Sequence, residues 1–278
     1  AKDTGNLPAV YTCRAQVYLD MENYKEAIRW YEKAVTAARQ VRNKDIEIMS
    51  LVKKGYCLSK SVSHAEGELA FRMAERQLQQ YRDSIEPDAY NNTLRKIFEF
   101  RSDIHYRSGK YTEALRLLDS AIAFNNKVNN YDARITNARY YKFIGQVYNE
   151  QNRPQEALAA FEIAGETYKN ANDYLSMAQV ENQKAYSYIK AGQYEQAVKI
   201  ADQATDWLIY LGDFNNAGYS RSLSGTAYWN LGKYDTALAY KKASVQLRRK
   251  SVNPYGEAGA WSDMGELFQL SVSRNLSM

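Results

Sequence analysis

The feature that most constrains this chain is a short residue pattern that recurs about every 40 residues. Each copy begins with a small residue, has tyrosine or histidine three positions later, and has alanine nine positions after that. The five clear copies are residues 15–35, 102–122, 145–165, 185–205 and 225–245. A fixed period of this length indicates stacked units, each of which buries its apolar face against its neighbours.

Two further copies of the pattern are weaker. One has Gly55, Leu58 and Ala70, with about three extra residues in the segment 61–67, and the other has Gly265 and Phe268. The small residues that anchor the copies stand at positions 15, 55, 102, 145, 185, 225 and 265. We expect the second repeat to be the least regular.

Within each copy the spacing of the apolar residues is that of an α-helix. Apolar and small residues recur at intervals of three and four. Alanine and glycine at the anchors allow two antiparallel helices to approach closely. Glycine is suited to the left-handed residue after a helix, which predicts helix ends at Gly109, Gly192 and Gly232. We expect Asn152 and Asn23 to take the same role.

This pattern resembles the tetratricopeptide repeat, whose signature is L-G-x2-Y followed by A-x3-F in a helix–turn–helix. The period of about 40 residues exceeds the usual 34. Similar long-period arrays occur in kinesin light chain and in bacterial peptide-sensing regulators. The resemblance implies an all-α, right-handed superhelical solenoid of antiparallel helix pairs, with six pairs and a final capping helix near residues 258–271. It implies a single domain over residues 1–278.

Few residues are available for catalysis or metal binding. The sequence contains no nucleotide-binding glycine loop, no G-x-S-x-G, no H-E-x-x-H and no paired C-x-x-C. His105 occupies a tyrosine position of the repeat and is expected to pack between helices, and His64 is expected in a solvated loop. Cys13 and Cys57 are expected to be two unpaired, half-buried thiols. We therefore expect no enzyme activity, no cofactor and no metal.

The charge and hydropathy of the chain exclude several other classes. The formal net charge is +5, which is far from the value typical of a nucleic-acid-binding domain. No apolar run is long enough to span a membrane, and no leader typical of a signal peptide opens the sequence. Residues 241–250 are strongly basic, and we interpret them as an outward, solvated helix, with an acidic partner or a membrane surface as the alternative.

In tetratricopeptide arrays the first helix of each pair lines a concave groove. The resemblance places polar and aromatic residues at the exposed positions of that groove here. Amides pair with a peptide backbone, cations with a carboxylate, and aromatic rings provide an anchor. The expected binding residues are Arg139, Lys142, Gln146, Asn149, Gln179, Asn182, Tyr186, Tyr219 and Trp229. The alternative interpretation is an ordinary solvated face.

The leading functional hypothesis is a non-enzymatic scaffold that binds a protein or a peptide carrying an acidic group. The alternative is that the chain, which begins with Ala1, is the sensor segment of a longer bacterial regulator with its output module elsewhere. Nucleic acid is not an expected partner. A scaffold is expected in the cytoplasm and a membrane-anchored sensor in the periplasm, and the sequence leaves this choice open.

Overall fold

The described residues of the computed structural model are 6–127, 131–251, 257–259, 261, 262, 264 and 265. They form α-helices, one short 3-10 helix and no strand, which confirms the predicted fold class. The helices are α1 (Leu7–Asp20), α2 (Tyr24–Gln40), α3 (Lys44–Ser61), α4 (His64–Gln80), η1 (Arg82–Ser84), α5 (Pro87–Arg107), α6 (Tyr111–Asn125), α7 (Tyr131–Glu150), α8 (Pro154–Asn170), α9 (Tyr174–Lys190), α10 (Tyr194–Tyr210), α11 (Phe214–Asn230) and α12 (Tyr234–Arg249).

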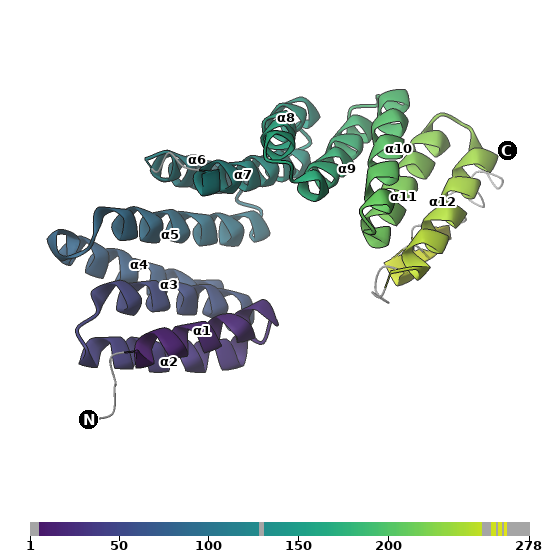
Figure 1. Cartoon of the computed structure of the whole chain (residues 1–278). Helices are drawn as coiled ribbons and strands as arrows, with labels where there is room; N and C mark the ends of the chain where they lie inside the picture. Colours follow the sequence, from purple (N-terminus) through teal and green to yellow (C-terminus); the bar gives the residue numbers. More distant parts are fainter. Residues whose placement is uncertain (1–5, 128–130, 252–256, 260, 263, 266–278) are drawn as a thin grey trace. The chain divides into compact units, whose positions relative to one another are not determined.

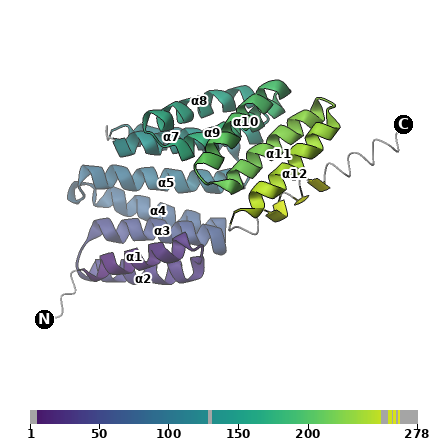
Figure 2. The ribbon, with the colours of Figure 1, turned by 45° about the vertical axis from the view of Figure 1, so that its right-hand side comes forward.

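The chain divides into two compact units, residues 1–133 and 134–278. In the first unit each helix from α1 to α5 packs against the next one along the chain, and α3 also packs against α1 and α5 (Figures 1 and 2). In the second unit α8 to α12 are packed in the same way. Each unit is therefore a stack of antiparallel helix pairs. That the whole chain forms one domain remains a prediction.

The turns between helices use residues with a left-handed backbone. Gly109, Gly192 and Gly232 have positive φ angles of 70°, 73° and 75°, as predicted. Asn152 also has a positive φ, of 56°. The prediction for Asn23 is wrong, because Asn23 is the N-cap of α2 and its side chain accepts a hydrogen bond from the backbone of the helix.

The small anchor residues are where the two helices of a pair touch. Gly145 on α7 faces the fully buried ring of Phe161 on α8. A Cβ atom added to Gly145 would lie 2.5 Å from a ring carbon of Phe161, which is closer than real Cβ contacts. The anchor in this repeat therefore has to be glycine, because the phenylalanine occupies the space of a side chain.

The alignment of the second repeat that was predicted from the sequence is wrong. The helix α4 begins at His64, nine residues after Gly55, which is the regular distance, so the segment 61–67 holds no insertion. Gly67 takes the position of the repeated alanine, and a Cβ there would lie 2.6 Å from the Cβ of Ser59. The extra residues lie after α4, in η1 and in the first turn of α5, which has 21 residues.

The basic helix α12 is not a purely solvated helix. Lys241 and Arg248 are only 4% and 7% exposed, whereas the other cations of residues 241–250 are exposed. Their aliphatic stems lie against glycines of α11, with Lys241 next to Gly225 and Arg248 next to Gly218. Long charged side chains thus fill the space that apolar side chains fill in the other pairs.

The expected capping helix is described only in part. Residues 257–259, 261, 262, 264 and 265 are helical, and Met264 is buried. Arg249 at the end of α12 forms an ion pair with Glu257 at 2.6 Å. The predicted residues 266–271 lie outside the described residues.

Candidate functional site

Polar side chains connect the first helices of successive pairs in the second unit. The Asn149 amide on α7 donates a hydrogen bond to the hydroxyl of Ser187 on α9, at 2.9 Å. Between α9 and α11 the direction is reversed, since the hydroxyl of Ser220 on α11 donates to the side-chain oxygen of Asn182 on α9. In both contacts the two residues are 38 positions apart, but they stand at different positions of the repeat, because Asn149 lies four residues after the anchor Gly145 and Asn182 three residues before the anchor Ala185. We call these contacts the inter-repeat ladder.

The ladder changes the role expected for two predicted binding residues. Asn149 and Asn182 are each only 2% exposed, so the expectation that they line an open surface is wrong. The amide of Asn182 also donates to the backbone oxygen of Asn216, at 3.4 Å. Their hydrogen-bonding groups are used between helices and are not directed to a ligand.

The two predicted cations lie close to each other on α7. Arg139 is exposed and Lys142 is half-buried. Burial lowers the pKa of Lys142, and the nearby Arg139 guanidinium lowers it further, while Asp173 opposes this effect. Two neighbouring positive charges, one of them partly removed from water, favour an anion between them.

The remaining predicted residues are half-buried, on α7, α9 and α11; they are Gln146, Gln179, Tyr186, Tyr219 and Trp229. The ring of Trp229 packs edge-on against Tyr234, with centroids 4.6 Å apart. Lys190 lies 5.4 Å from the ring centre of Tyr186, and Arg248 lies 5.9 Å from that of Tyr219. The aromatic side chains are thus oriented by neighbours and retain partly exposed surface.

Sequence reasoning missed a cavity on the first helices of the first unit. It has a volume of about 350 Å³ and is lined by Gln16, Leu19, Asp20, Glu22, Tyr24, Lys53, Tyr56, Lys96 and Phe100. Burial lowers the pKa of Lys53, and the nearby Lys96 lowers it further. Gln16 accepts a hydrogen bond from Lys53 at 2.8 Å. The signal was present, since Gln16 and Tyr56 hold equivalent groove positions one after their anchors.

The two cysteines and the two histidines differ in how far they are buried. Both cysteines are unpaired, as predicted, but Cys13 is exposed and Cys57 is fully buried, so the expectation that both are half-buried is wrong. His105 packs at its helix interface, and burial lowers its pKa. His64 is exposed but begins α4, and its Nδ1 lies 3.1 Å from the hydroxyl of Ser108.

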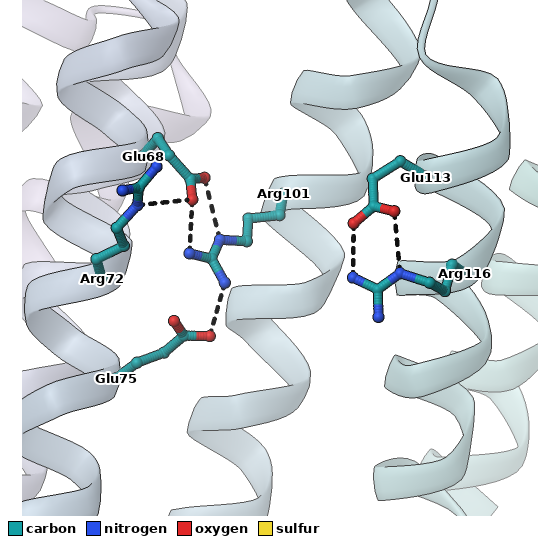
Figure 3. A network of polar contacts seen from close by, with 6 residues as sticks. All are labelled: Glu68, Arg72, Glu75, Arg101, Glu113 and Arg116. Carbon is teal, nitrogen blue, oxygen red and sulfur yellow. Dashed lines mark hydrogen bonds and ion pairs between the residues drawn. The ribbon is translucent and has the colours of Figure 1, made fainter.

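An ion-pair network joins α4 to α5 in the first unit (Figure 3). Arg101 contacts both carboxylate oxygens of Glu68, at 2.6 and 3.0 Å, and reaches Glu75 at 2.7 Å. Arg101 is only 14% exposed, so solvent screens these contacts weakly. The network therefore stabilises the contact between α4 and α5, and the Arg101 guanidinium is used for these ion pairs.

Within the part of the chain that the structure describes, no group of three or more histidine, cysteine or acidic residues is arranged to hold a metal ion. No helix in the same residues has the length and apolarity needed to cross a membrane.

Family comparisons match three segments of the chain. Residues 8–40 and residues 220–251 each match a tetratricopeptide repeat model. Tetratricopeptide repeats are present in this chain. Residues 100–210 match the model of soluble NSF attachment protein, SNAP. A search of curated proteins gave no match.

Solved structures with tetratricopeptide-like helices share the fold. The STAND protein with a tetratricopeptide repeat sensor, PH0952 from Pyrococcus horikoshii, has a TM-score of 0.77 and 11% identity, over 95% of this chain and 39% of that one. The apo form of RapI has a TM-score of 0.71 and 11% identity, over 97% and 73%. A Rap protein complexed with Competence and Sporulation Factor has a TM-score of 0.61 and 12% identity, over 96% and 72%. At these identities the likeness concerns the fold.

Proposed function

We propose that this chain is a non-enzymatic scaffold that binds an extended peptide, or a segment of a protein, on the first helices of its second unit. The repeats and the shared fold support a protein-interaction role. The pairing of Arg139 with the half-buried Lys142 is the observation that carries the finer proposal. Because these two cations favour an anion between them, the proposed ligand carries an acidic group.

The other end of the proposed ligand is apolar or aromatic. Trp229 on α11 offers a partly exposed ring, held by Tyr234. Helices pack about 8–10 Å apart, so α7, α9 and α11 match the reach of six to eight extended residues. Gln146, Gln179 and Tyr186 lie on α7 and α9 and provide polar groups for the peptide backbone.

The proposal is tested with an acetylated octapeptide that has aspartate near one end and phenylalanine near the other. Removing a central arginine or tryptophan from an interface costs about 2 kcal/mol or more, which is roughly thirtyfold in affinity. We expect Arg139→Ala and Trp229→Ala each to weaken binding by that factor or more, measured by fluorescence anisotropy, while the helical circular dichroism signal is unchanged.

The control for this experiment is Arg249→Ala on the basic helix α12. Arg249 is exposed and pairs with Glu257, so its loss should leave the peptide affinity nearly intact. Equal binding by native chain and groove variants, or binding abolished only by Arg249→Ala, would assign the ligand to another face.

A sensor segment of a larger regulator is the second candidate. The observation that favours it is the TM-score of 0.77 with a STAND protein whose tetratricopeptide part is a sensor. The Rap protein solved with Competence and Sporulation Factor supports recognition of a signalling factor by this fold. Sequencing the coding region on both sides of this chain tests the idea, because this hypothesis expects an output module in the same polypeptide.

A further inference from the structure

A second concave surface lies on a different face of the second unit. It is a trough of about 900 Å³ between α8 and α10, with α9 at its floor. On α9 it is lined by Tyr174, Met177, Ala178, Glu181 and Lys184, whereas the binding residues proposed above on α9 are Gln179 and Tyr186. With 100° of rotation per residue, these two sets occupy different faces of the helix.

Aromatic rings form one wall of this trough. Tyr174 and Trp207 are stacked with ring centroids 5.5 Å apart and planes 6° from parallel. Tyr210 meets Trp207 edge-on at 6.3 Å. All three belong to the exposed large hydrophobic residues of the chain, at 38%, 43% and 82% exposure. An exposed, preformed aromatic stack of this kind is typical of a binding surface.

The charges of the trough are mainly negative, although the chain as a whole is basic. Its lining contains four acidic residues and two lysines; they are Glu162, Glu166, Glu181, Asp206, Lys169 and Lys184. Lys184 is already engaged, since it pairs with Glu162 at 2.7 Å and with Glu181 at 3.2 Å. Glu166 and Asp206 are exposed, on α8 and α10, and form no ion pair within the described residues.

A glycine keeps the trough open. Gly165 lies inside α8, where glycine costs about 1 kcal/mol relative to alanine. A Cβ added at Gly165 would have its nearest neighbours at 3.6 and 3.7 Å, which are ordinary contacts. Helix packing therefore does not require this glycine, in contrast to Gly145. The missing side chain adds depth to the trough instead.

From these observations we propose that the trough binds an arginine-containing segment of a partner protein. An arginine side chain is planar and positively charged, so it stacks on Trp207 or Tyr174 and pairs with Glu166 or Asp206. Lysine lacks the planar group and fits the stack less well. This site is independent of the peptide surface on α7, α9 and α11, so the chain can hold two partners at once.

The test uses the full chain and a fluorescein-labelled heptapeptide with two arginines, separated by one glycine and flanked by leucines. The matched peptides carry lysine or citrulline in place of both arginines. Citrulline keeps the planar shape and removes the charge. We expect the arginine peptide to bind at least tenfold more tightly than the citrulline peptide, with an affinity that falls as salt is added.

Variants of the chain assign the binding to the trough. Trp207→Ala should weaken binding of the arginine peptide at least tenfold, and the double variant Glu166→Gln, Asp206→Asn should weaken it and reduce its salt dependence. Gly165→Leu should block the trough by filling it, and Gly165→Ala, which the structure accommodates, is the milder variant if leucine unfolds the chain. Trp229→Ala, on the other face, should change the affinity by less than twofold.

Several results would overturn the proposal. They are equal binding of the arginine and citrulline peptides, unchanged affinity in Trp207→Ala and in both Gly165 variants, and no binding at millimolar peptide. A dimer in sedimentation experiments that Trp207→Ala dissociates would show that a second copy of this chain occupies the trough. The result of the Trp229→Ala variant with the acidic octapeptide distinguishes failure of this site from failure of the proposed scaffold function.

Discussion

The Asn149 amide and the Ser187 hydroxyl, 38 residues apart, hold α7 against α9 through a buried hydrogen bond. A buried hydrogen bond of this kind contributes about 1 kcal/mol, and leaving one partner unsatisfied costs about 1–3 kcal/mol. Asn149→Ala should therefore lower the free energy of unfolding by about 1–2 kcal/mol, measured by urea denaturation.

The matched control for Asn149 is Gln155→Ala, because Gln155 is exposed on the neighbouring helix α8. This change should alter the free energy of unfolding by less than about 0.5 kcal/mol. If Asn149→Ala is as stable as the native chain but binds the octapeptide less tightly, the original assignment of Asn149 to a ligand would be restored.

Substitution by alanine at two glycines of the same helix pair should change the free energy of unfolding in opposite directions. Gly145→Ala places a Cβ 2.5 Å from the buried ring of Phe161, and such overpacking costs about 1–3 kcal/mol. Gly165→Ala makes only ordinary contacts and gains helix propensity, so it should stabilise the chain by about 0.5–1 kcal/mol. Thermal and urea unfolding of both variants measure this difference, and equal effects would contradict the packing described for Gly145.

His105 should make the stability of the chain depend on pH above the range where carboxylates titrate. Burial lowers its pKa in the folded chain, despite the opposing charges of Glu113 and Glu68. The unfolded chain then binds the proton more tightly, so stability is lost as pH falls through the ordinary histidine value of about 6.5 towards the folded value. Its Nδ1 is buried with no hydrogen-bond partner in the described residues, which agrees with a neutral ring.

The variant His105→Tyr tests this prediction, because tyrosine is the residue at this position in four of the other repeats. It should remove the loss of stability that sets in as pH falls through about 6.5, followed by urea denaturation from pH 8 down to about pH 5. His64→Gln, at an exposed histidine, should retain the loss. A native chain with constant stability over this interval would show that the folded state accepts the proton on His105 without cost.

The two cysteines should differ in reactivity with a thiol reagent. Cys13 is exposed and should react at once in the native chain, whereas Cys57 is fully buried and burial raises its pKa to about 12. Cys57 should therefore react only after denaturation, and both thiols should be counted without any reductant. A count that rises by two on reduction would show a disulfide and contradict the unpaired state.

The sequence predicted the helix pairs, because their periodicity and turn residues are local signals. Gly109, Gly192, Gly232 and Asn152 were found from composition and spacing alone, since a left-handed backbone selects few residue types. The second repeat was misaligned because Gly67 stands where other copies have alanine. The start of α4 at His64 and the packing of Gly67 against Ser59 identify that position.

The predicted site was partly misassigned for a different reason. Helical spacing gives the direction of a side chain but not what the next repeat places opposite it. Asn182 was therefore expected to face a ligand, whereas Ser220 and Asn216 of the following helix receive it. The trough at Trp207 was missed because it is formed by side chains from three helices, and no single repeat contains its pattern.

The longer helices α5 and α7 indicate how many residues can be added before the anchor of a first helix. Ser102 stands 15 residues after the start of α5 and Gly145 stands 14 after the start of α7, whereas Ala185 and Gly225 stand 11 after theirs. The additions are of four and three residues, each close to one helical turn, so the anchor keeps its direction. An addition of two residues would rotate the anchor by about 200° away from its partner helix. Insertions near these helices should therefore be tolerated only when they add about one whole helical turn. When residues are deleted one after another from the start of α5, the stability of the chain should fall at first and return once three or four residues have been removed.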